Sequence, residues 1–440
     1  MKRIKTYFYS IFAITLCLTI GMNGYGQGKK IEKSYRWNYT VNQDVSFAFK
    51  NYDCNLTIHT WDKPEIAYTM SVDATLKSEE DAKRLDDFIE ELEFSHSAGS
   101  VQFDNRFWTS KKAIMGRKTM TLKGARTVRF SEFKMKGEMW IPKNCILNLT
   151  SKYSEIEVED LNGRLSLDLY NDKVYGGRVN SNMKIVAKYS TLEFTNMKDI
   201  KADLYNTNIE AGDIGNLSAV SKYSKFKAGD AGKVDIDAYN DKYAIGTAGD
   251  IRFIDKYSDL TAEQTGHTEL DCYNSTININ RVADVVLKSK YGTYEFKEAR
   301  NLNIATAYSD KFTIDSLGTL NITDSKYCVY KIDHLEKSLF LKEGYSDKLF
   351  VTKTGSLKEV KVNGKYVVLE MALDKDFSYR FKANVKYPKF DIDEESMNVK
   401  KKIKESSELE MEAVKGPESE GMPSFFVNGY DMAVTLTEQY

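Results

Sequence analysis

Apolar and polar residues alternate in short runs along most of the chain, and Asn, Asp and Gly separate the runs. Residues 184–187 (Lys-Ile-Val-Ala) and 191–194 (Thr-Leu-Glu-Phe) are typical of this pattern. Alternation over a few residues indicates a half-buried β-strand, because successive side chains point to opposite faces. From residue 151 to residue 376 the alternation contains no proline and no helical period. The pattern therefore predicts an all-β protein.

A tyrosine recurs between the two strands of each unit, 13 times in all. Two kinds of unit alternate, Lys-Tyr-Ser as at 188–190 and Tyr-Asn-Asp as at 239–241. From Tyr189 to Tyr291 the residue number of the tyrosine increases in alternating steps of 16 and 18, so that the mean step is about 17. The recurring tyrosines are Tyr153, Tyr170, Tyr189, Tyr205, Tyr223, Tyr239, Tyr257, Tyr273, Tyr291, Tyr308, Tyr327, Tyr345 and Tyr366.

The alternating interval indicates units of nearly equal length in which the tyrosine slips by one position in every second unit. The apolar residues support this interpretation: they follow Tyr189 by three and five positions (Leu192, Phe194) but Tyr239 by four and six (Tyr243, Ile245). A shift of one residue moves a strand side chain to the opposite face. We therefore expect successive tyrosines to project differently, one toward the core and the next outward or at a corner.

A period of about 17 residues is too short for a βαβ unit or a propeller blade. It suits one turn, or rung, of a parallel β-solenoid, and twelve or thirteen rungs would make a rod on the order of 60 Å long. Antiparallel hairpins in a large open sheet or barrel are the alternative, although hairpins seldom keep one period over so many copies. The predicted fold is all-β, a single-chain parallel β-solenoid with about 17 residues per rung.

The two ends of the chain depart from the repeat. Residues 27–150 form an N-terminal β region with one helix at 78–92, where Ser78 and the following acidic residues make a helix start and an apolar stripe follows. Residues 151–375 hold the solenoid repeats. Residues 376–440 form a C-terminal cap, with a polar loop near 398–420 and a closing apolar strand at 425–436. We expect the helix and the cap to cover the open ends of the stack.

The first 26 residues have the pattern of a secretory signal peptide. A basic start is followed by an apolar run at 7–20 and by Gly24 and Gly26, which predict cleavage after Gly26. An uncleaved anchor helix is the alternative, but the run is short for a bilayer, and we expect no membrane span after the signal is removed. The protein is expected in the periplasm, at the outer-membrane surface or outside the cell. The remaining cysteines, Cys54, Cys145, Cys272 and Cys328, are expected to be buried and unpaired.

The composition argues against catalysis and against nucleic-acid binding. The net charge is −1, with 63 Lys and Arg against 64 Asp and Glu, and the four histidines are scattered. No nucleophile, nucleotide or metalloprotease motif is present, so we expect no enzyme, no cofactor and no metal. Aspartates follow several tyrosines, at Asp172, Asp241, Asp259, Asp310 and Asp347. Because the glycine-rich nonapeptides of calcium-binding β-rolls are missing, these aspartates are expected to cap their own turns.

The tyrosines of the Tyr-Asn-Asp units are the candidate contact surface. Stacked aromatic rings beside Ser, Asn and Asp side chains would make a flat amphipathic strip suited to glycan rings or to a partner's surface. Packing of the rungs alone would also explain such a column. The candidate residues are Tyr170, Tyr205, Tyr239, Tyr273, Tyr308 and Tyr345.

The chain resembles the bacterial putative-adhesin family of β-solenoids, catalogued mainly as a domain of unknown function. The resemblance rests on 140–143 (Trp-Ile-Pro-Lys), which leads into the repeats through 147–149, on the strand at 55–58 and on the single helix. These are loose strand-and-turn patterns, and the family usually carries glycines where this chain has Tyr-Ser or Tyr-Asn. The resemblance implies an exported envelope β-solenoid without catalytic residues.

Taken together, these features favour a non-catalytic, exported cell-envelope protein that acts by surface contact, as an adhesin or a scaffold. Its expected partner is a glycan or another envelope protein. Two alternatives stay open. A carbohydrate-active β-helix enzyme would need two or three acidic or basic side chains clustered on one face. A self-assembling envelope rod would need an uncapped end.

Overall fold

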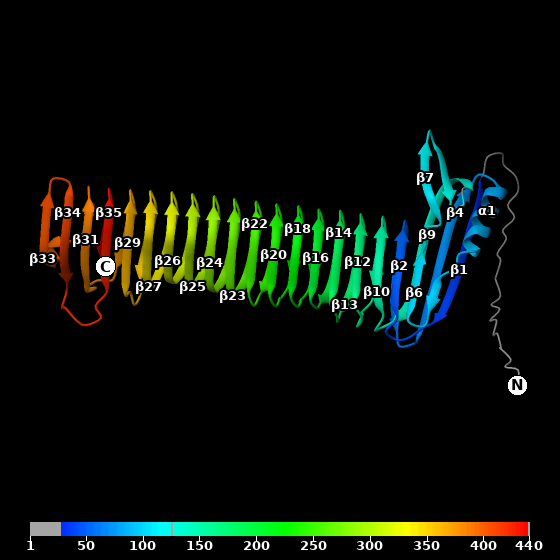
Figure 1. Ribbon diagram of the computed structural model, residues 1–440, viewed down its shortest axis with the longest axis horizontal. Coiled ribbons are helices and arrows are strands. Elements are labelled where there is room, and N and C mark those ends of the chain that lie inside the picture. The colour runs from blue at the N-terminus through cyan, green and yellow to red at the C-terminus, as the bar shows by residue number, and fades with distance from the viewer. Residues whose placement is uncertain (1–27, 125, 439–440) are drawn as a thin grey trace.

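A computed structural model describes residues 28–124 and 126–438, which form one long rod (Figure 1). The predicted signal peptide, residues 1–26, lies outside the described residues. In the described part, no helix combines the length and the apolar content needed to cross a bilayer.

Each rung of the rod contributes one strand to each of two sheets, and neighbouring rungs pair in parallel. Ile200 lies beside Leu217, Leu217 beside Val234 and Val234 beside Ile251, so these rungs repeat at the interval that the tyrosines predict. Between Tyr153 and Tyr366 the chain makes about 12 turns of roughly 18 residues. The prediction of a parallel β-solenoid is confirmed, and the antiparallel alternative is wrong.

The first sheet contains the strands that end at the recurring tyrosine: β2 (Ser46–Tyr52), β10 (Ile146–Lys152), β12 (Leu165–Tyr170), β14 (Met183–Lys188), β16 (Ile200–Tyr205), β18 (Leu217–Lys222), β20 (Val234–Tyr239) and β22 (Ile251–Lys256). The second sheet contains β3 (Cys54–Trp61), β11 (Glu155–Val158), β13 (Lys173–Val179), β15 (Thr191–Met197), β17 (Asn208–Ala211), β19 (Lys225–Ala228) and β21 (Lys242–Thr247). Longer strands then continue both sheets: β23 (Asp259–Tyr273), β24 (Thr276–Lys290), β25 (Thr293–Tyr308), β26 (Lys311–Lys326) and β27 (Val329–Tyr345), followed by β28 (Lys348–Thr354), β29 (Glu359–Lys365) and β30 (Val368–Leu373).

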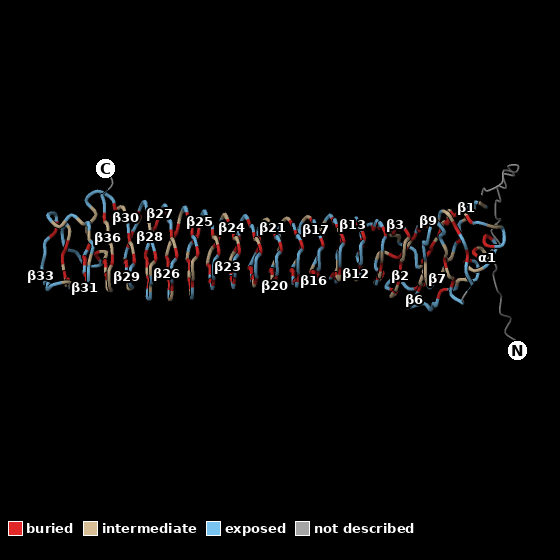
Figure 2. Tube along the Cα trace, turned by 90° about the horizontal axis from the view of Figure 1, so that it is seen from above, coloured by how far each residue is buried: buried red, intermediate tan, exposed pale blue. Residues whose placement is uncertain are grey.

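The core lies between the sheets and runs the length of the rod (Figure 2). Alternate residues of each strand point inward, and the parallel register places like on like. Ile200, Ala202 and Leu204 are buried, as are Leu217 and Ala219, which lie beside the first two in the next rung. Because every rung repeats the same alternation, apolar columns stack from rung to rung, and the inward column nearest the turn also includes buried polar residues, as where Ser221 lies beside Leu204.

The N-terminal end is closed by strands of mixed direction and the predicted helix. It contains β1 (Lys29–Thr40), β4 (Glu65–Leu76), β5 (Ser95–Ser97), β6 (Ser100–Asp104), β7 (Trp108–Ile114), β8 (Arg117–Leu122), β9 (Thr127–Pro142) and α1 (Glu79–Glu90). Strands β6 and β9 still pair in parallel with β2 and β3, and the strands beyond them are antiparallel. The Asp81 backbone N–H donates to the Ser78 hydroxyl, which caps α1, and Leu85 and Ile89 of its apolar face are buried.

Part of this N-terminal region belongs to the solenoid itself. Strands β2 and β3 form the first rung, because β2 pairs in parallel with β10 and β3 with β11, which come much later in the chain. The solenoid therefore begins before residue 151, and residues 65–142 form an insertion that covers its end.

The C-terminal end is built in the same way from β31 (Tyr379–Lys386), β32 (Lys389–Asp391), η1 (Glu394–Ser396), β33 (Met397–Glu405), β34 (Glu408–Lys415), β35 (Ser424–Tyr430) and β36 (Ala433–Glu438). Strand β35 inserts between β29 and β31, so the segment expected as one closing strand is a further rung. The prediction of a polar loop at 398–420 is wrong over most of its length. That segment forms the antiparallel hairpin β33–β34, in which Lys401 Nζ lies 2.7 Å from Glu410 Oε1.

Candidate functional site

A single left-handed residue makes the turn at the recurring tyrosine. In Lys-Tyr-Ser rungs this residue is the tyrosine itself, with φ between 56° and 63°. In Tyr-Asn-Asp rungs the tyrosine is the last residue of the strand, and the left-handed residue is Asn, Ser or Asp, with φ between 47° and 57°. The register joins the two kinds, since Lys152 lies beside Tyr170 and Tyr170 beside Lys188. The predicted one-residue slip is confirmed.

The expectation that alternate tyrosines face the core is wrong. The left-handed tyrosines are 43–55% exposed, and five of the strand-end tyrosines are 36–37% exposed. The parity rule applies within a strand, whereas a left-handed residue turns the backbone and sends its side chain to the same side as the strand-end residue of the next rung.

All these tyrosines join in one continuous row, the tyrosine ladder. Successive ring centroids lie 5.2–5.8 Å apart and the ring planes meet at 72–81°, an edge-to-face packing. With one ring per rung, 15 rings extend over on the order of 70 Å. The ladder runs through Tyr153, Tyr170, Tyr189, Tyr205, Tyr223, Tyr239, Tyr257, Tyr273, Tyr291, Tyr308, Tyr327, Tyr345, Tyr366, Tyr430 and Tyr387.

The six candidate tyrosines are therefore members of a larger ladder. Tyr170, Tyr205, Tyr239, Tyr273, Tyr308 and Tyr345 are strand-end residues and do not touch one another. A left-handed tyrosine separates each pair, as Tyr189 separates Tyr170 from Tyr205. The left-handed tyrosines were not among the predicted candidate residues, although the same repeat contains them.

Lysines alternate with the strand-end tyrosines along the ladder. They form the lysine row: Lys152, Lys188, Lys222, Lys256, Lys290, Lys326, Lys365 and Lys386. Lys386 lies 3.3 Å from Glu408, and the Lys152 ammonium lies 5.7 Å from the Tyr170 ring centroid. Among the described residues, no carboxylate lies within 4.0 Å of the other seven ammonium groups. The ladder thus carries a positive charge at every second rung.

Buried aspartates lie directly beneath the ladder. Asp172 Oδ2 accepts the backbone N–H of Tyr170 in its own turn at 3.0 Å, as predicted for a turn cap. Its Oδ1 also accepts the Ser154 N–H at 2.8 Å and the Ser151 hydroxyl at 3.1 Å from the preceding rung. The sequence pattern did not predict this second role, in which the carboxylate joins one rung to the next by hydrogen bonds. Asp241, Asp310 and Asp347 repeat the arrangement, whereas Asp259 is partly exposed and pairs with Lys242 at 3.2 Å.

Burial changes the acidity of these carboxyl groups. Loss of hydration raises the pKa of Asp172, Asp310 and Asp347 to about 6, against an ordinary value of 3.8, despite the N–H and O–H groups that they accept. The same cause raises the pKa of Asp241. In the part of the chain that the structure describes, no three His, Cys, Asp or Glu side chains converge as metal ligands would.

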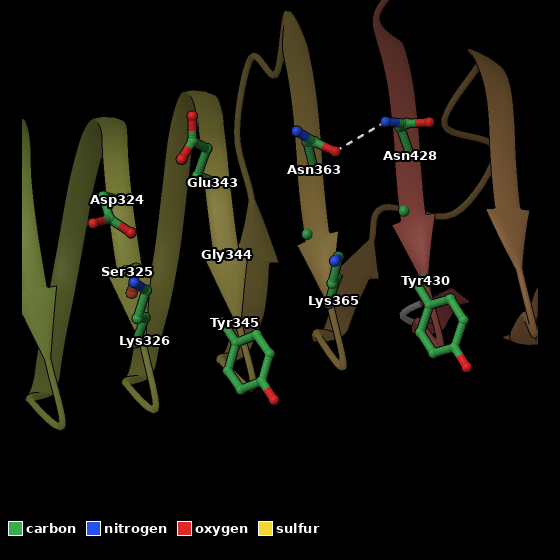
Figure 3. A pocket seen from close by; sticks show the side chains of 12 residues that line it. Asp324, Ser325, Lys326, Glu343, Gly344, Tyr345, Asn363, Lys365, Asn428 and Tyr430 are labelled. Atoms are coloured by element: carbon green, nitrogen blue, oxygen red, sulfur yellow. Dashed lines mark hydrogen bonds between the residues drawn. The ribbon is translucent and has the colours of Figure 1, made fainter.

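The ladder has a shallow hollow of about 530 Å³ toward its C-terminal end (Figure 3). Asp324, Glu343, Asn363 and Asn428 cross neighbouring strands in a row, and the Tyr345 and Tyr430 rings extend from two of the strand ends. Gly344, Gly364 and Gly429 line this hollow, each at the position before the last residue of its strand, which is Tyr345, Lys365 or Tyr430. A Cβ on Gly429 would lie 1.9 Å from the Gly364 carbonyl oxygen, so the backbones approach too closely for a side chain.

A second hollow, of about 780 Å³, lies over the second sheet near the N-terminal end. It is lined by Glu157, Glu159, Glu193 and Glu210 together with His59. His59 Nδ1 lies 2.8 Å from Glu159 Oε1, and this hydrogen bond holds the pKa of Glu159 below its usual range. Carboxylates therefore do gather on one face, as a polysaccharide-cleaving enzyme would require.

The four cysteines that the structure describes are buried and free, as expected. Burial raises the pKa of the Cys54 and Cys145 thiols to about 12 and that of Cys328 to about 11, so little thiolate forms at neutral pH.

Comparisons with known proteins add little to this geometry. No family model and no curated protein match the chain. One solved structure, a putative cell adhesion protein from Clostridium sporogenes, aligns over 93% of this chain and 100% of its own at 8% identity, with a TM-score of 0.17. Another, a putative lipid binding protein from Parabacteroides distasonis, aligns over 69% of this chain and 98% of its own at 10% identity, with a TM-score of 0.25. At TM-scores this low, the comparisons show neither a shared fold nor a shared function.

Proposed function

We propose that the protein is a non-catalytic cell-envelope protein that acts by surface contact, as an adhesin or a scaffold, and that the tyrosine ladder is its contact surface. The observation that carries the proposal is the unbroken row of 15 rings, at least a third exposed in most members. Exposed aromatic rings in such number are costly in water unless a partner covers them. The signal-peptide pattern at residues 1–26 supports export.

An extended glycan suits the ladder better than a compact partner. The ladder is long and narrow, and it repeats every two rungs, or about 10 Å. A polymer with a repeating unit could contact many equivalent positions at once, so weak individual contacts would add to a useful avidity. The polar row at the C-terminal hollow offers amide and carboxylate groups for sugar hydroxyls. Another envelope protein is the alternative partner.

Binding to polysaccharides tests the proposal. Purified protein is run through gels containing soluble envelope polysaccharides, and retardation measures affinity. Substituting Tyr223, Tyr257 and Tyr291 by Asn should weaken binding on the order of 100-fold, at about 1 kcal/mol per ring. The substitution keeps each turn, because Asn already occupies the left-handed position in neighbouring rungs, for example at Asn240.

The matched control is Val286→Thr, which removes an apolar side chain of similar exposure (37%) that lies in β24, outside the ladder and outside both hollows. It should bind as the unsubstituted protein does. If the triple variant binds polysaccharide and envelope extracts as tightly as the control, the ladder is a packing feature and the proposal fails.

The second hollow, which Glu157, Glu159, Glu193 and Glu210 line, supports the alternative of a polysaccharide-cleaving enzyme, and this alternative can be tested directly. Incubation with the same polysaccharides should release no new reducing ends. Release that disappears in Glu159→Gln would replace the contact function by glycan cleavage at this hollow.

A further inference from the structure

A hairpin projects from the N-terminal end of the rod, away from the stacked rungs (Figure 1). Strands β7 and β8 form it, with Ile114 paired to Arg117 across a two-residue turn of Met115 and Gly116. Both turn residues have positive φ, 48° and 77°, as in a type I′ turn.

The tip of this hairpin is apolar and open to solvent. Ile114 is 65% exposed and Met115 is 99% exposed. The first position of a type I′ turn favours Asn, Asp or Gly, which tolerate a positive φ, and an unbranched apolar residue there is unfavourable for folding. Met115 therefore occupies a strained position, and its exposed side chain makes no packing contact that would compensate for the strain. The stability of the fold does not explain this residue.

The hairpin is also strongly cationic. From residue 105 to residue 131 there are eight Lys and Arg residues and no Asp or Glu. Three of these cations pair with carboxylates outside the segment: Lys111 with Asp53 at 2.9 Å, Lys123 with Asp104 at 3.2 Å and Arg129 with Asp81 at 3.2 Å.

The cations nearest the tip are Lys112, Arg117 and Lys118. All three are exposed, and among the described residues none has a carboxylate within 4.0 Å. Lys118 Nζ donates to the Ser131 carbonyl of the neighbouring strand β9 at 3.0 Å. The base is rigid, since Trp108, Met120 and Leu122 are buried and β8 pairs with β9.

We propose that this hairpin docks onto the surface of an anionic lipid bilayer. Ile114 and Met115 enter the boundary between head groups and acyl chains, and Lys112, Arg117 and Lys118 contact the anionic head groups around them. An apolar point within a ring of cations matches such a surface in both polarity and charge. Two side chains offer too little area for a stable protein interface, and an apolar tip gains nothing from the phosphates of a nucleic acid. This inference is independent of the tyrosine ladder.

Vesicle flotation tests the proposal with the intact protein. Vesicles of phosphatidylcholine alone are compared with vesicles of equal parts phosphatidylcholine and phosphatidylglycerol. The protein should float with the anionic vesicles only, and added salt should weaken the binding. The double variant Ile114→Thr with Met115→Asn removes the apolar tip while favouring the turn, and it should bind on the order of 10-fold more weakly. Replacing Lys112, Arg117 and Lys118 by Gln should weaken binding on the order of 100-fold.

The matched control replaces Lys331, Lys348 and Lys353 by Gln, which removes the same charge from exposed positions of β27 and β28, far from the hairpin, and its binding should be unchanged. In the variant Met115→Cys a polarity-sensitive dye can be attached at the tip, because the native cysteines that the structure describes are buried. Its emission should shift to the blue with anionic vesicles. Equal binding to neutral vesicles, no binding, or unchanged binding of the tip variant would overturn the proposal. So would tighter binding to heparin or DNA that needs the three cations but not the apolar tip.

Discussion

At the scale of single residues, the buried aspartates decide how stability depends on pH. Asp310 accepts the Gly292 N–H at 2.6 Å, the Ser289 hydroxyl at 2.8 Å and the Tyr308 N–H at 2.9 Å, and it has no ion pair among the described residues. Burial raises the pKa of Asp172, Asp255, Asp310 and Asp347 to about 6. These groups are therefore held at neutral pH as charges that the interior disfavours.

We expect the protein to be more stable at about pH 5 than at about pH 7.5. Between the unfolded value of 3.8 and the folded value of about 6, only the folded chain keeps the proton. The stabilisation is thus complete below 3.8 and is lost as the pH rises through about 6, at about 1.4 kcal/mol per unit of pKa difference for each group. Thermal unfolding followed by circular dichroism should show a midpoint several degrees higher at the lower pH. A midpoint that rises steadily toward pH 7.5 would contradict this assignment.

In one rung the buried aspartate occupies a different position of the repeat, as Asp255, and this difference allows the role of the aspartates to be tested. Where Asp241 and Asp310 follow a Tyr-Asn or Tyr-Ser turn, the corresponding residue is Ser275, and the Ser258 N–H donates instead to Asp255 Oδ2 at 3.1 Å. Asp255→Ser should destabilise by about 1–3 kcal/mol, because the buried Ser258 N–H loses its acceptor. Ser275→Asp alone should also destabilise, since it puts two buried carboxylates side by side.

The double variant Asp255→Ser with Ser275→Asp should recover most of the loss, because it restores the arrangement of the neighbouring rungs. Denaturant midpoints of the four proteins measure the coupling. Additive losses in the double variant would show that the aspartate columns are not interchangeable.

At the scale of the turn and its strands, the left-handed position governs which residues the ladder tolerates. Tyr223 has φ 56° and lies between Asn206 and Asn240, which occupy the same position in the adjacent rungs. Tyr223→Asn should lose only the two ring contacts, each at 5.7 Å between centroids. Tyr223→Val should lose the same contacts and cost about 1–2 kcal/mol more, because a β-branched residue is strained at positive φ. Equal unfolding midpoints for the two variants would count against this explanation of the repeat.

The same turn shows what the sequence could and could not predict. The period of the rungs, the one-residue slip and the parallel stacking follow from the alternation alone, because parallel register repeats whatever one rung contains. The direction in which the tyrosines point does not follow from the alternation. The left-handed residue turns the backbone, so the rule that successive side chains point to opposite faces no longer applies there. The hydrogen bonds of Asp172 to the preceding rung were missed for a related reason: a turn aspartate looks the same in sequence whether it is exposed or buried.

At the scale of the whole molecule, distant segments close both ends of the rod. The first rung, β2–β3, lies beside β10–β11 although the whole N-terminal insertion separates them in the chain, and β35 inserts beside β29 across the strands β30 to β34. Neither segment carries the tyrosine period in sequence, which explains why the boundaries of the stack were harder to predict than its interior. Beyond them lie antiparallel strands, β1 at one end and β33 at the other, whereas the second sheet ends at the C-terminal side in the short strand β32, which pairs in parallel with β36.

The outermost strand β33 should keep the rod from lengthening by end-to-end addition. It carries Lys400, Lys401, Lys402 and Lys404 and, among the strands that the structure describes, pairs with β34 alone, so its other edge offers backbone groups to a second copy. Charges on an edge strand oppose such pairing because they would be forced together or desolvated.

The protein should therefore remain a monomer in light scattering as its concentration increases. Replacing the four lysines by Thr, a strong strand former, should produce oligomers that grow with concentration. Long filaments of the unsubstituted protein would contradict this prediction and would favour the self-assembling rod as its function. The edge of β33 would then bind the next copy.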